Sequence, residues 1–267
     1  MLKDITMGQY FPGSSLIHKL DPRTKLIFVV LYIVLLFTAK WFVSYALVLL
    51  FLVWVIATAK ISLKVILKSL KPLLFIIILT GVLNLFYTQG TPVLKFWIIT
   101  ITKEGILAAI FMVLRIGMLI AGTFMLTYTT SPIALTDGLE SLLSPLKKVH
   151  VPVHELAMMM CIALRFIPTL IEETDKIMSA QKARGADFET GNLVRRAKAL
   201  IPILVPLFIS AFRRADELAV AMECRCYHGG EGRTRLRQLV FAARDRIAFV
   251  VGAVLLAATF LLRYFGL

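Results

Sequence analysis

Long stretches without charged side chains constrain this sequence more than any other feature. Between Lys25 and Lys60 the only charged residue is Lys40, and residues 72–94 contain none. A transmembrane helix needs about 20 mostly apolar residues, so stretches of this kind are typical of membrane spans. One helix from Lys25 to Lys60 would be about 50 Å long, which exceeds a hydrocarbon layer of about 30 Å. We therefore expect two short helices joined by a tight turn at Thr38–Trp41.

Three further stretches are expected to cross the membrane. They cover residues 72–86, residues 105–129 (interrupted only by Arg115) and residues 247–262. Residues 93–102 are short, β-branched and aromatic, and we expect them to be interfacial or extracytoplasmic. The sequence thus predicts an all-α polytopic membrane protein with about five transmembrane helices.

Composition supports the membrane class. Hydrophobic residues make up 59% of the chain and charged residues 17%, against roughly 45–50% and about 25% in soluble domains. The net charge of +14 is typical of cytoplasmic loops of a membrane protein, and we expect no nucleic-acid partner. Three cysteines are too few for a disulfide scaffold, and an apolar run that begins only at residue 26 does not fit a signal peptide.

The distribution of lysine and arginine predicts the orientation. Basic residues cluster before the first predicted helix (Lys19, Arg23, Lys25) and after the second (Lys60, Lys64, Lys68, Lys71). Both clusters should be cytoplasmic. Five spans then leave the N-terminus inside and the C-terminus outside. The expected regions are a four-helix membrane arm (1–130), a cytoplasmic helical region (131–240) and a C-terminal transmembrane helix (241–267).

The cytoplasmic region contains one pattern twice. An amphipathic stripe beginning at Phe166 ends in Ala183-Arg184-Gly185, with Gly185 in the position of a helix C-cap. A second stripe from Phe208 ends in Cys224-Arg225-Cys226, with two glycines just beyond. We expect each helix to be preceded by proline, at Pro168 in the first copy and at Pro202 and Pro206 in the second.

The two arginines have two alternative interpretations. A basic residue near a helix C-terminus complements the helix dipole, which contributes about 0.3–1 kcal/mol. Small neighbours also leave each guanidinium free to enter a carboxylate-lined groove of a partner. Two equivalent arginines would suit a partner with two-fold symmetry.

Two other segments of this region are predicted to be helical. Residues 132–149 should form a helix at the lipid boundary or beneath the other two. In an alternative topology, residues 156–171 and 199–212 form a hairpin inside the membrane, which leaves the orientation of the other spans unchanged.

The residues needed for catalysis are not recognisable in the sequence. It has no phosphate-binding GxxxxGK[ST] loop, so ATP, if used, must be bound by another subunit. His150 and His154 are four residues apart, but Pro152 disfavours the single helix that would align them as metal ligands. Arg115, without an acidic partner, is more typical of a helix anchor than of a transport path.

Two motifs resemble a known family. Residues 8–13 (GQYFPG) and 15–25 (SLIHKLDPRTK) resemble the N-terminal signature of the transmembrane T component of energy-coupling factor transporters, and the arginine tripeptides resemble its two coupling-helix motifs. The resemblance covers essentially the whole chain. It implies an L-shaped all-α scaffold in a prokaryotic plasma membrane, which joins two ABC-type ATPases, identical or different, to a small membrane subunit that captures a vitamin or metal ion.

The resemblance also implies the site residues. The ATPase-docking residues would be Ala183, Arg184, Gly185, Cys224, Arg225 and Cys226. The surface for the capture subunit would include Met158, Met159 and Met160, although core packing explains these methionines equally well. No cofactor is expected on this chain, since ATP and magnesium would bind the partner subunits. The alternative function is a self-sufficient permease driven by an ion gradient.

Overall fold

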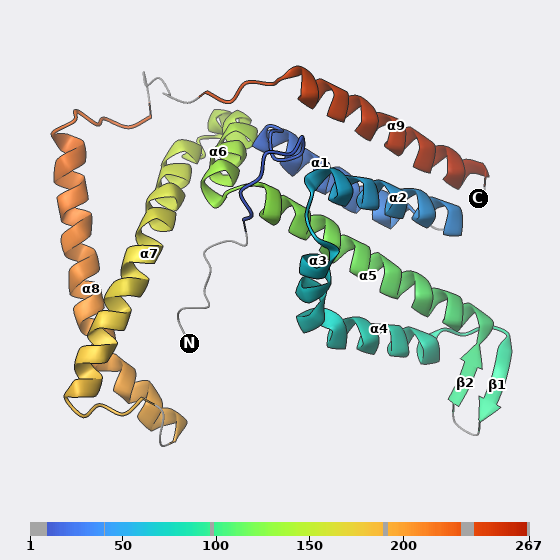
Figure 1. The fold of residues 1–267 in the computed structure, drawn as a ribbon, viewed down its shortest axis with the longest axis horizontal. Coiled ribbons are helices and arrows are strands. Elements are labelled where there is room, and N and C mark those ends of the chain that lie inside the picture. The colour runs from blue at the N-terminus through green and yellow to red at the C-terminus, as the bar shows by residue number, and fades with distance from the viewer. Residues whose placement is uncertain (1–9, 40, 97–98, 189–191, 231–237, 266–267) are drawn as a thin grey trace. The chain divides into compact units, whose positions relative to one another are not determined.

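The computed structural model describes residues 10–39, 41–96, 99–188, 192–230 and 238–265, and these residues are mainly helical (Figure 1). Gly8, Gln9 and Lys40, used above, lie outside the described residues. The all-α class is confirmed, with one small antiparallel hairpin added. In chain order the elements are α1 (Pro22–Thr38), α2 (Phe42–Ala59), α3 (Leu63–Leu70), η2 (Lys71–Leu73), α4 (Leu74–Tyr87), β1 (Pro92–Phe96), β2 (Ile99–Thr102), α5 (Lys103–Thr129), α6 (Pro132–Leu143), η3 (Ser144–Val149), α7 (Val153–Ala183), α8 (Leu193–Glu223) and α9 (Ala243–Phe265).

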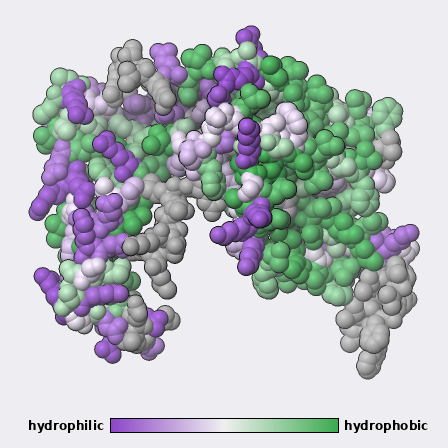
Figure 2. Space-filling view, viewed as in Figure 1, coloured by the Kyte–Doolittle hydropathy of each residue, from purple (hydrophilic) through white to green (hydrophobic). Residues whose placement is uncertain are grey.

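The chain forms two compact units. The larger unit comprises residues 8–138 and 239–267, and the smaller unit comprises residues 139–238. Hydrophobic residues cover most of the visible face of the larger unit (Figure 2). Leu50 and Phe75, for example, are 72% and 74% exposed. Such a surface is stable against lipid and unfavourable in water, which supports a membrane environment for this unit.

Among the residues that the structure describes, five helical segments are long and apolar enough to cross a membrane. They are α2, α3 and α4 together, α5, α7 and α9. The predicted number of five is matched, but the set includes α7 and omits α1. With 17 residues, α1 is at the lower end of the usual length of a span. The length and hydropathy of α7 are compatible with the alternative topology, in which residues 156–171 and 199–212 form a hairpin inside the membrane.

Element boundaries correct one sequence prediction and add detail to two others. Helix α1 begins at Pro22 because Asp21 caps it, its Oδ1 accepting a hydrogen bond from the Arg23 backbone N–H at 2.9 Å. Lys25 therefore lies inside the helix and not before it. The segment after Lys60, for which only a cytoplasmic location was predicted, contains the helix α3. Residues 92–102, which include the segment expected to be interfacial or extracytoplasmic, contain two paired strands.

Prolines do not precede the two long helices as predicted. Pro168 lies within α7, and Pro202 and Pro206 lie within α8. An interior proline removes one backbone hydrogen bond and crowds the preceding turn, which bends a long helix without ending it. Figure 1 shows α8 changing direction in its first half.

Helices α1, α2 and α5 pack around a buried core in the larger unit. A Cβ on Gly122 of α5 would lie 2.2 Å from the Tyr32 ring of α1, so only glycine allows this close approach. The Tyr32 hydroxyl donates to the Met118 carbonyl at 2.9 Å. On the same helix, Arg115 Nε donates to the Tyr45 hydroxyl at 2.8 Å, and its guanidinium lies 5.7 Å from the centre of the Phe37 ring. Arg115 thus connects α5 to Tyr45 of α2 and Phe37 of α1.

The N-terminal signature connects three helices of the larger unit. The Phe11 N–H donates to the Tyr128 carbonyl at the end of α5 at 3.0 Å. The Asp21 N–H donates to Asp245 at the start of α9 at 2.9 Å. Between them, Lys25 Nζ donates to the Thr129 carbonyl at 2.9 Å. The signature is thus a structural junction that joins α1, α5 and α9.

A histidine completes this junction. His18 Nε2 lies 3.0 Å from the Phe11 carbonyl oxygen, and Nδ1 lies 2.6 Å from Ser15 Oγ. Burial lowers the pKa of His18, which favours the neutral imidazole. A neutral ring that donates from Nε2 to the carbonyl and accepts at Nδ1 from the hydroxyl satisfies both contacts.

Candidate functional site

The end of α7 carries the first predicted arginine in a Schellman motif. The Ala186 N–H donates to the Gln181 carbonyl, and the Gly185 N–H donates to the Lys182 carbonyl, both at 3.0 Å. Gly185 has φ of 87°, in the left-handed region that glycine adopts at little cost. This confirms its predicted place just beyond the helix. Arg184 occupies the last position before the turn.

The end of α8 has the same hydrogen-bond pattern. The Tyr227 N–H donates to the Met222 carbonyl at 3.1 Å, and the Cys226 N–H donates to the Glu223 carbonyl at 2.8 Å. Cys226 has φ of 55° and corresponds to Gly185. The glycines beyond it, expected to end the helix, are not the residues in this turn. Arg225 and Arg184 therefore occupy equivalent backbone positions.

The two turns predict substitutions of opposite effect. Gly185→Ala places a Cβ in the left-handed region, which costs about 1 kcal/mol, whereas Cys226→Gly relieves a cost of similar size. Hydrogen exchange followed by mass spectrometry measures the opening of each helix end. We expect about fivefold faster exchange near residues 185–186 in Gly185→Ala, and about fivefold slower exchange near residues 226–227 in Cys226→Gly. Changes in the same direction would contradict the equivalence of the two turns.

All six residues predicted for docking are exposed on these helix ends. Ala183, Arg184 and Gly185 are exposed after α7, and Cys224, Arg225 and Cys226 are exposed after α8. Within the described part of the chain, neither Arg184 nor Arg225 forms an ion pair. Both guanidinium groups are therefore available to a partner's acceptor groups.

Helices α7 and α8 are paired through equivalent residues, which the sequence analysis missed. They cross each other with opposite chain directions (Figure 1). Arg214 of α8 binds Glu173 of α7 with an N–O distance of 2.7 Å, and the two residues are 41 positions apart. Arg184 and Arg225 are also 41 positions apart. This repeated spacing was the signal in the sequence from which the pairing of equivalent residues could have been inferred.

This pairing gives the smaller unit a local pseudo-two-fold relation. When two antiparallel helices are related by a two-fold axis, a residue of one helix contacts the equivalent residue of the other only close to that axis. Glu173 precedes Arg184 by eleven residues, as Arg214 precedes Arg225. At about 1.5 Å per residue, each arginine lies about 16 Å along its helix from the contact, in opposite directions. The smaller unit thus presents two similar arginine tips at opposite ends of one helix pair.

A second contact supports the segment that follows Arg225. His154 Nδ1 at the start of α7 lies 3.0 Å from Glu140 Oε1 of α6. Gly230 packs against the His154 ring so closely that a Cβ there would lie 2.5 Å from it. His150 ends η3, outside α7, so the two histidines do not share a helix, as Pro152 predicted.

Apolar side chains of α7 and α8 are largely exposed. The predicted residues Met159 and Met160 are 55% and 44% exposed, while Met158 is half-buried. On α8 the exposed apolar side chains include Val205, Phe208 and Phe212. Exposed apolar surface of this kind marks contact with a protein or with lipid.

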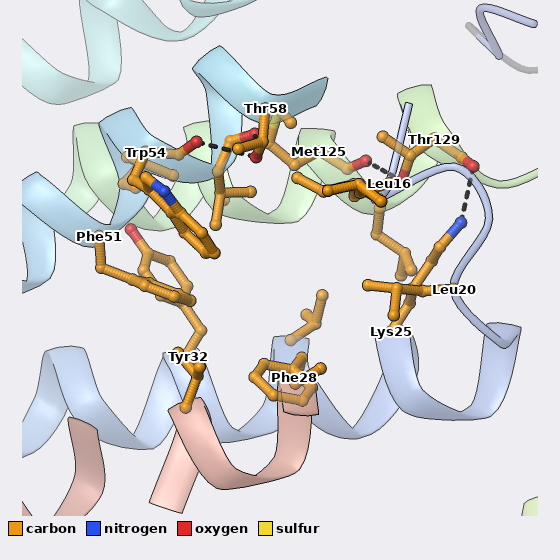
Figure 3. A pocket seen from close by; sticks show the side chains of 18 of the residues that line it. Leu16, Leu20, Lys25, Phe28, Tyr32, Phe51, Trp54, Thr58, Met125 and Thr129 are labelled. Atoms are coloured by element: carbon orange, nitrogen blue, oxygen red, sulfur yellow. Dashed lines mark hydrogen bonds between the residues drawn. The ribbon is translucent and has the colours of Figure 1, made fainter. Parts of the chain in front are cut away.

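The larger unit contains an apolar cavity of about 320 Å³. Phe28, Tyr32, Phe51 and Trp54 lie around it (Figure 3). Lys25 also lines it, but its ammonium group is hydrogen-bonded to the Thr129 carbonyl. This lining suits a hydrocarbon group and offers little to a polar nutrient or an ion.

Comparison with known proteins identifies close relatives. Residues 13–236 match the family described as cobalt transport protein, CbiQ. An energy-coupling factor transporter transmembrane protein, EcfT, of Thermosediminibacter oceani is 56% identical over 98% of this chain and 99% of its own length. Proteins of the same name from Bacillus subtilis and Lactococcus lactis subsp. cremoris are 49% and 45% identical, over 98% and 93% of this chain and 100% and 94% of their own lengths.

Proposed function

The chain belongs to the EcfT family of energy-coupling factor transporter transmembrane proteins, and from this premise we propose that it couples two cytoplasmic ATPases to a substrate-capture membrane subunit. Its transport role as a multi-pass membrane protein follows from the family and from the five candidate spans. The finer role depends on one observation, the equivalence of the helix ends that carry Arg184 and Arg225.

Two equivalent arginine tips are suited to two similar ATPase subunits. An arginine guanidinium forms paired hydrogen bonds with carboxylate, and the small neighbours leave it accessible. A dimer of similar ATPases would offer two similar grooves related by two-fold symmetry. The pseudo-two-fold relation of α7 and α8 supports this match, whereas a dipole effect alone would not require the two tips to be alike.

The helix pair would transmit movement from the ATPases. ATP binding closes an ATPase pair and moves its two grooves relative to each other. With the tips held in those grooves, α7 and α8 would shift together, since Arg214 and Glu173 join them. The exposed apolar side chains around Met158, Met159 and Met160 would pass this shift to the capture subunit, which then releases a vitamin or another micronutrient.

The remaining parts of the proposal concern chemistry and orientation. The chain itself carries out no catalysis and binds no cofactor, since ATP and magnesium belong to the ATPase subunits. The region 131–240 and the N-terminus lie in the cytoplasm, and the C-terminus lies outside. Lysines that cluster beside α3 support this orientation.

Isolation of the intact complex tests the proposal. The tagged chain is purified from its own membranes in mild detergent, and its partners are quantified by mass spectrometry. We expect two ATPase subunits, identical or different, and at least one small membrane protein. Several small membrane proteins would indicate a coupling unit shared between nutrients.

A self-sufficient permease is the alternative function, and reconstitution separates the two. The purified chain alone, in vesicles with an ion gradient, should accumulate no nutrient. Accumulation without ATPases would contradict the coupling role. The apolar cavity favours coupling, because a permease needs polar binding groups near the middle of the membrane.

A further inference from the structure

Four lysines follow one another at helical spacing beside the third predicted span. They are Lys60, Lys64, Lys68 and Lys71, and the sequence has no acidic residue between Asp21 and Glu104. Within the part of the chain that the structure describes, none of the four forms an ion pair. Their positive charge therefore remains uncompensated by neighbouring side chains.

Helix α3 holds two of these lysines, Lys64 and Lys68, beside a face that packs on the larger unit, and Lys71 follows at the start of η2. Ile66 is 4% exposed, and the Ser69 hydroxyl is hydrogen-bonded to the Tyr128 hydroxyl of α5. After η2 the chain turns sharply, so that α3 lies across the direction of α4 (Figure 1). If α4 crosses the membrane, α3 lies along its surface.

The exposed faces of α3 divide into a basic row and an apolar row. At about 100° per residue, Lys64, Lys68 and Lys71 fall within an arc of about 60°, and a row of leucines lies about 90° to one side. Leu63 and Leu67 in that row are 62% and 64% exposed. Lys64 and Lys68 are also exposed. This arrangement directs the leucines sideways into acyl chains while the lysines reach the headgroups.

We propose that α3 is an interfacial helix that, together with the start of η2, binds the phosphate groups of anionic phospholipids through Lys64 and Lys68 of α3 and Lys71 of η2. Charge complementarity identifies the ligand class, and the adjacent exposed leucines favour lipid over an acidic protein. The inference requires only that the larger unit is embedded in a membrane. It is therefore independent of the coupling role of Arg184 and Arg225.

Lipid retention by the full-length protein tests this inference. The purified chain is titrated with dioleoyl phosphatidylglycerol or with dioleoyl phosphatidylcholine, and bound lipids are counted by native mass spectrometry. The test variant is K64Q/K68Q/K71Q. The control variant, K148Q/K176Q/K198Q, removes the same charge from exposed positions of the smaller unit. A basic side chain near an anionic surface contributes about fivefold in affinity, so the test variant should lose at least tenfold for phosphatidylglycerol.

The conservative variant K64R/K68R/K71R should retain phosphatidylglycerol, because it keeps the charge. Circular dichroism of each variant verifies that the helices are intact. Equal retention of the two lipids by the unaltered protein would overturn the proposal, and so would an equal loss in the test and control variants. The proposal would also be overturned if the test variant lost an acidic protein partner while it retained phosphatidylglycerol unchanged, because the basic row would then bind that protein.

Discussion

The variant with both Arg184→Glu and Arg225→Glu is expected to lose its ATPases on purification and to support no nutrient uptake. Each substitution replaces a guanidinium by a carboxylate that would repel an acidic groove. Breaking a charge-assisted contact at an interface costs about 2–5 kcal/mol, so two together weaken binding by a factor of about 10³ or more. ATPase recovery by quantitative mass spectrometry and uptake by intact cells measure the loss.

The single variants sharpen this test. If the two tips hold one ATPase dimer, as proposed, they act together, and each single variant should retain a reduced, measurable amount of ATPase. Because the backbone turns at Arg184 and Arg225 are equivalent, the two single variants should be affected to a similar extent. The corresponding lysine variants should be intermediate, since lysine keeps the charge but lacks the planar fork.

A control variant separates docking from net charge. Arg195→Glu with Arg213→Glu makes the same change in charge at two exposed positions of α8 that belong to neither arginine tripeptide. It should purify with its ATPases and support uptake. If this control fails as completely as the tip variant, or if the tip variant keeps its ATPases, the arginines are not the docking residues.

The sequence predicts the spans and the arginine tips well because both depend on local patterns. Apolar runs identified the regions of α2, α4, α5 and α9, and the glycine after Arg184 identified the end of α7. Repetition of the small-Arg-small tripeptide identified the second tip. Its turn nevertheless has Cys226 in a left-handed conformation, which residue preferences alone would not predict.

Features that depend on tertiary contacts were missed. Helix α3 was not predicted, because its lysines were explained by orientation alone, while Ile66 and Ser69 hold it against the core. Pro168 was expected to precede its helix, yet it lies inside α7, which continues on both sides of it. The Glu173–Arg214 contact depends on the pairing of α7 with α8, at which the 41-residue spacing of the two arginines was the only hint.

Lys25 shows how far a structural role can differ from a charge-based one. The sequence assigned it to membrane orientation together with Lys19. In the structure Lys25 is 7% exposed, and its Nζ donates to the carbonyls of His18 and Thr129 at 3.2 and 2.9 Å and to Thr130 Oγ1 at 3.2 Å. One ammonium group thus joins the N-terminal signature, α1 and the end of α5.

Lys25→Met is therefore expected to lower the free energy of unfolding by about 3–5 kcal/mol, the usual cost of removing one partner from a buried charged contact. Methionine has a similar length but cannot donate, so buried carbonyls are left without their hydrogen bonds. Lys19→Met removes the same charge from an exposed position of the same segment and should change stability by less than about 0.5 kcal/mol. Unfolding in mixed micelles, followed by circular dichroism, measures both variants. Equal free energies of unfolding in the two variants would contradict this structural role of Lys25. If Lys25 served orientation alone, both substitutions would instead invert the protein in the membrane to the same extent, which the location of an N-terminal tag reports.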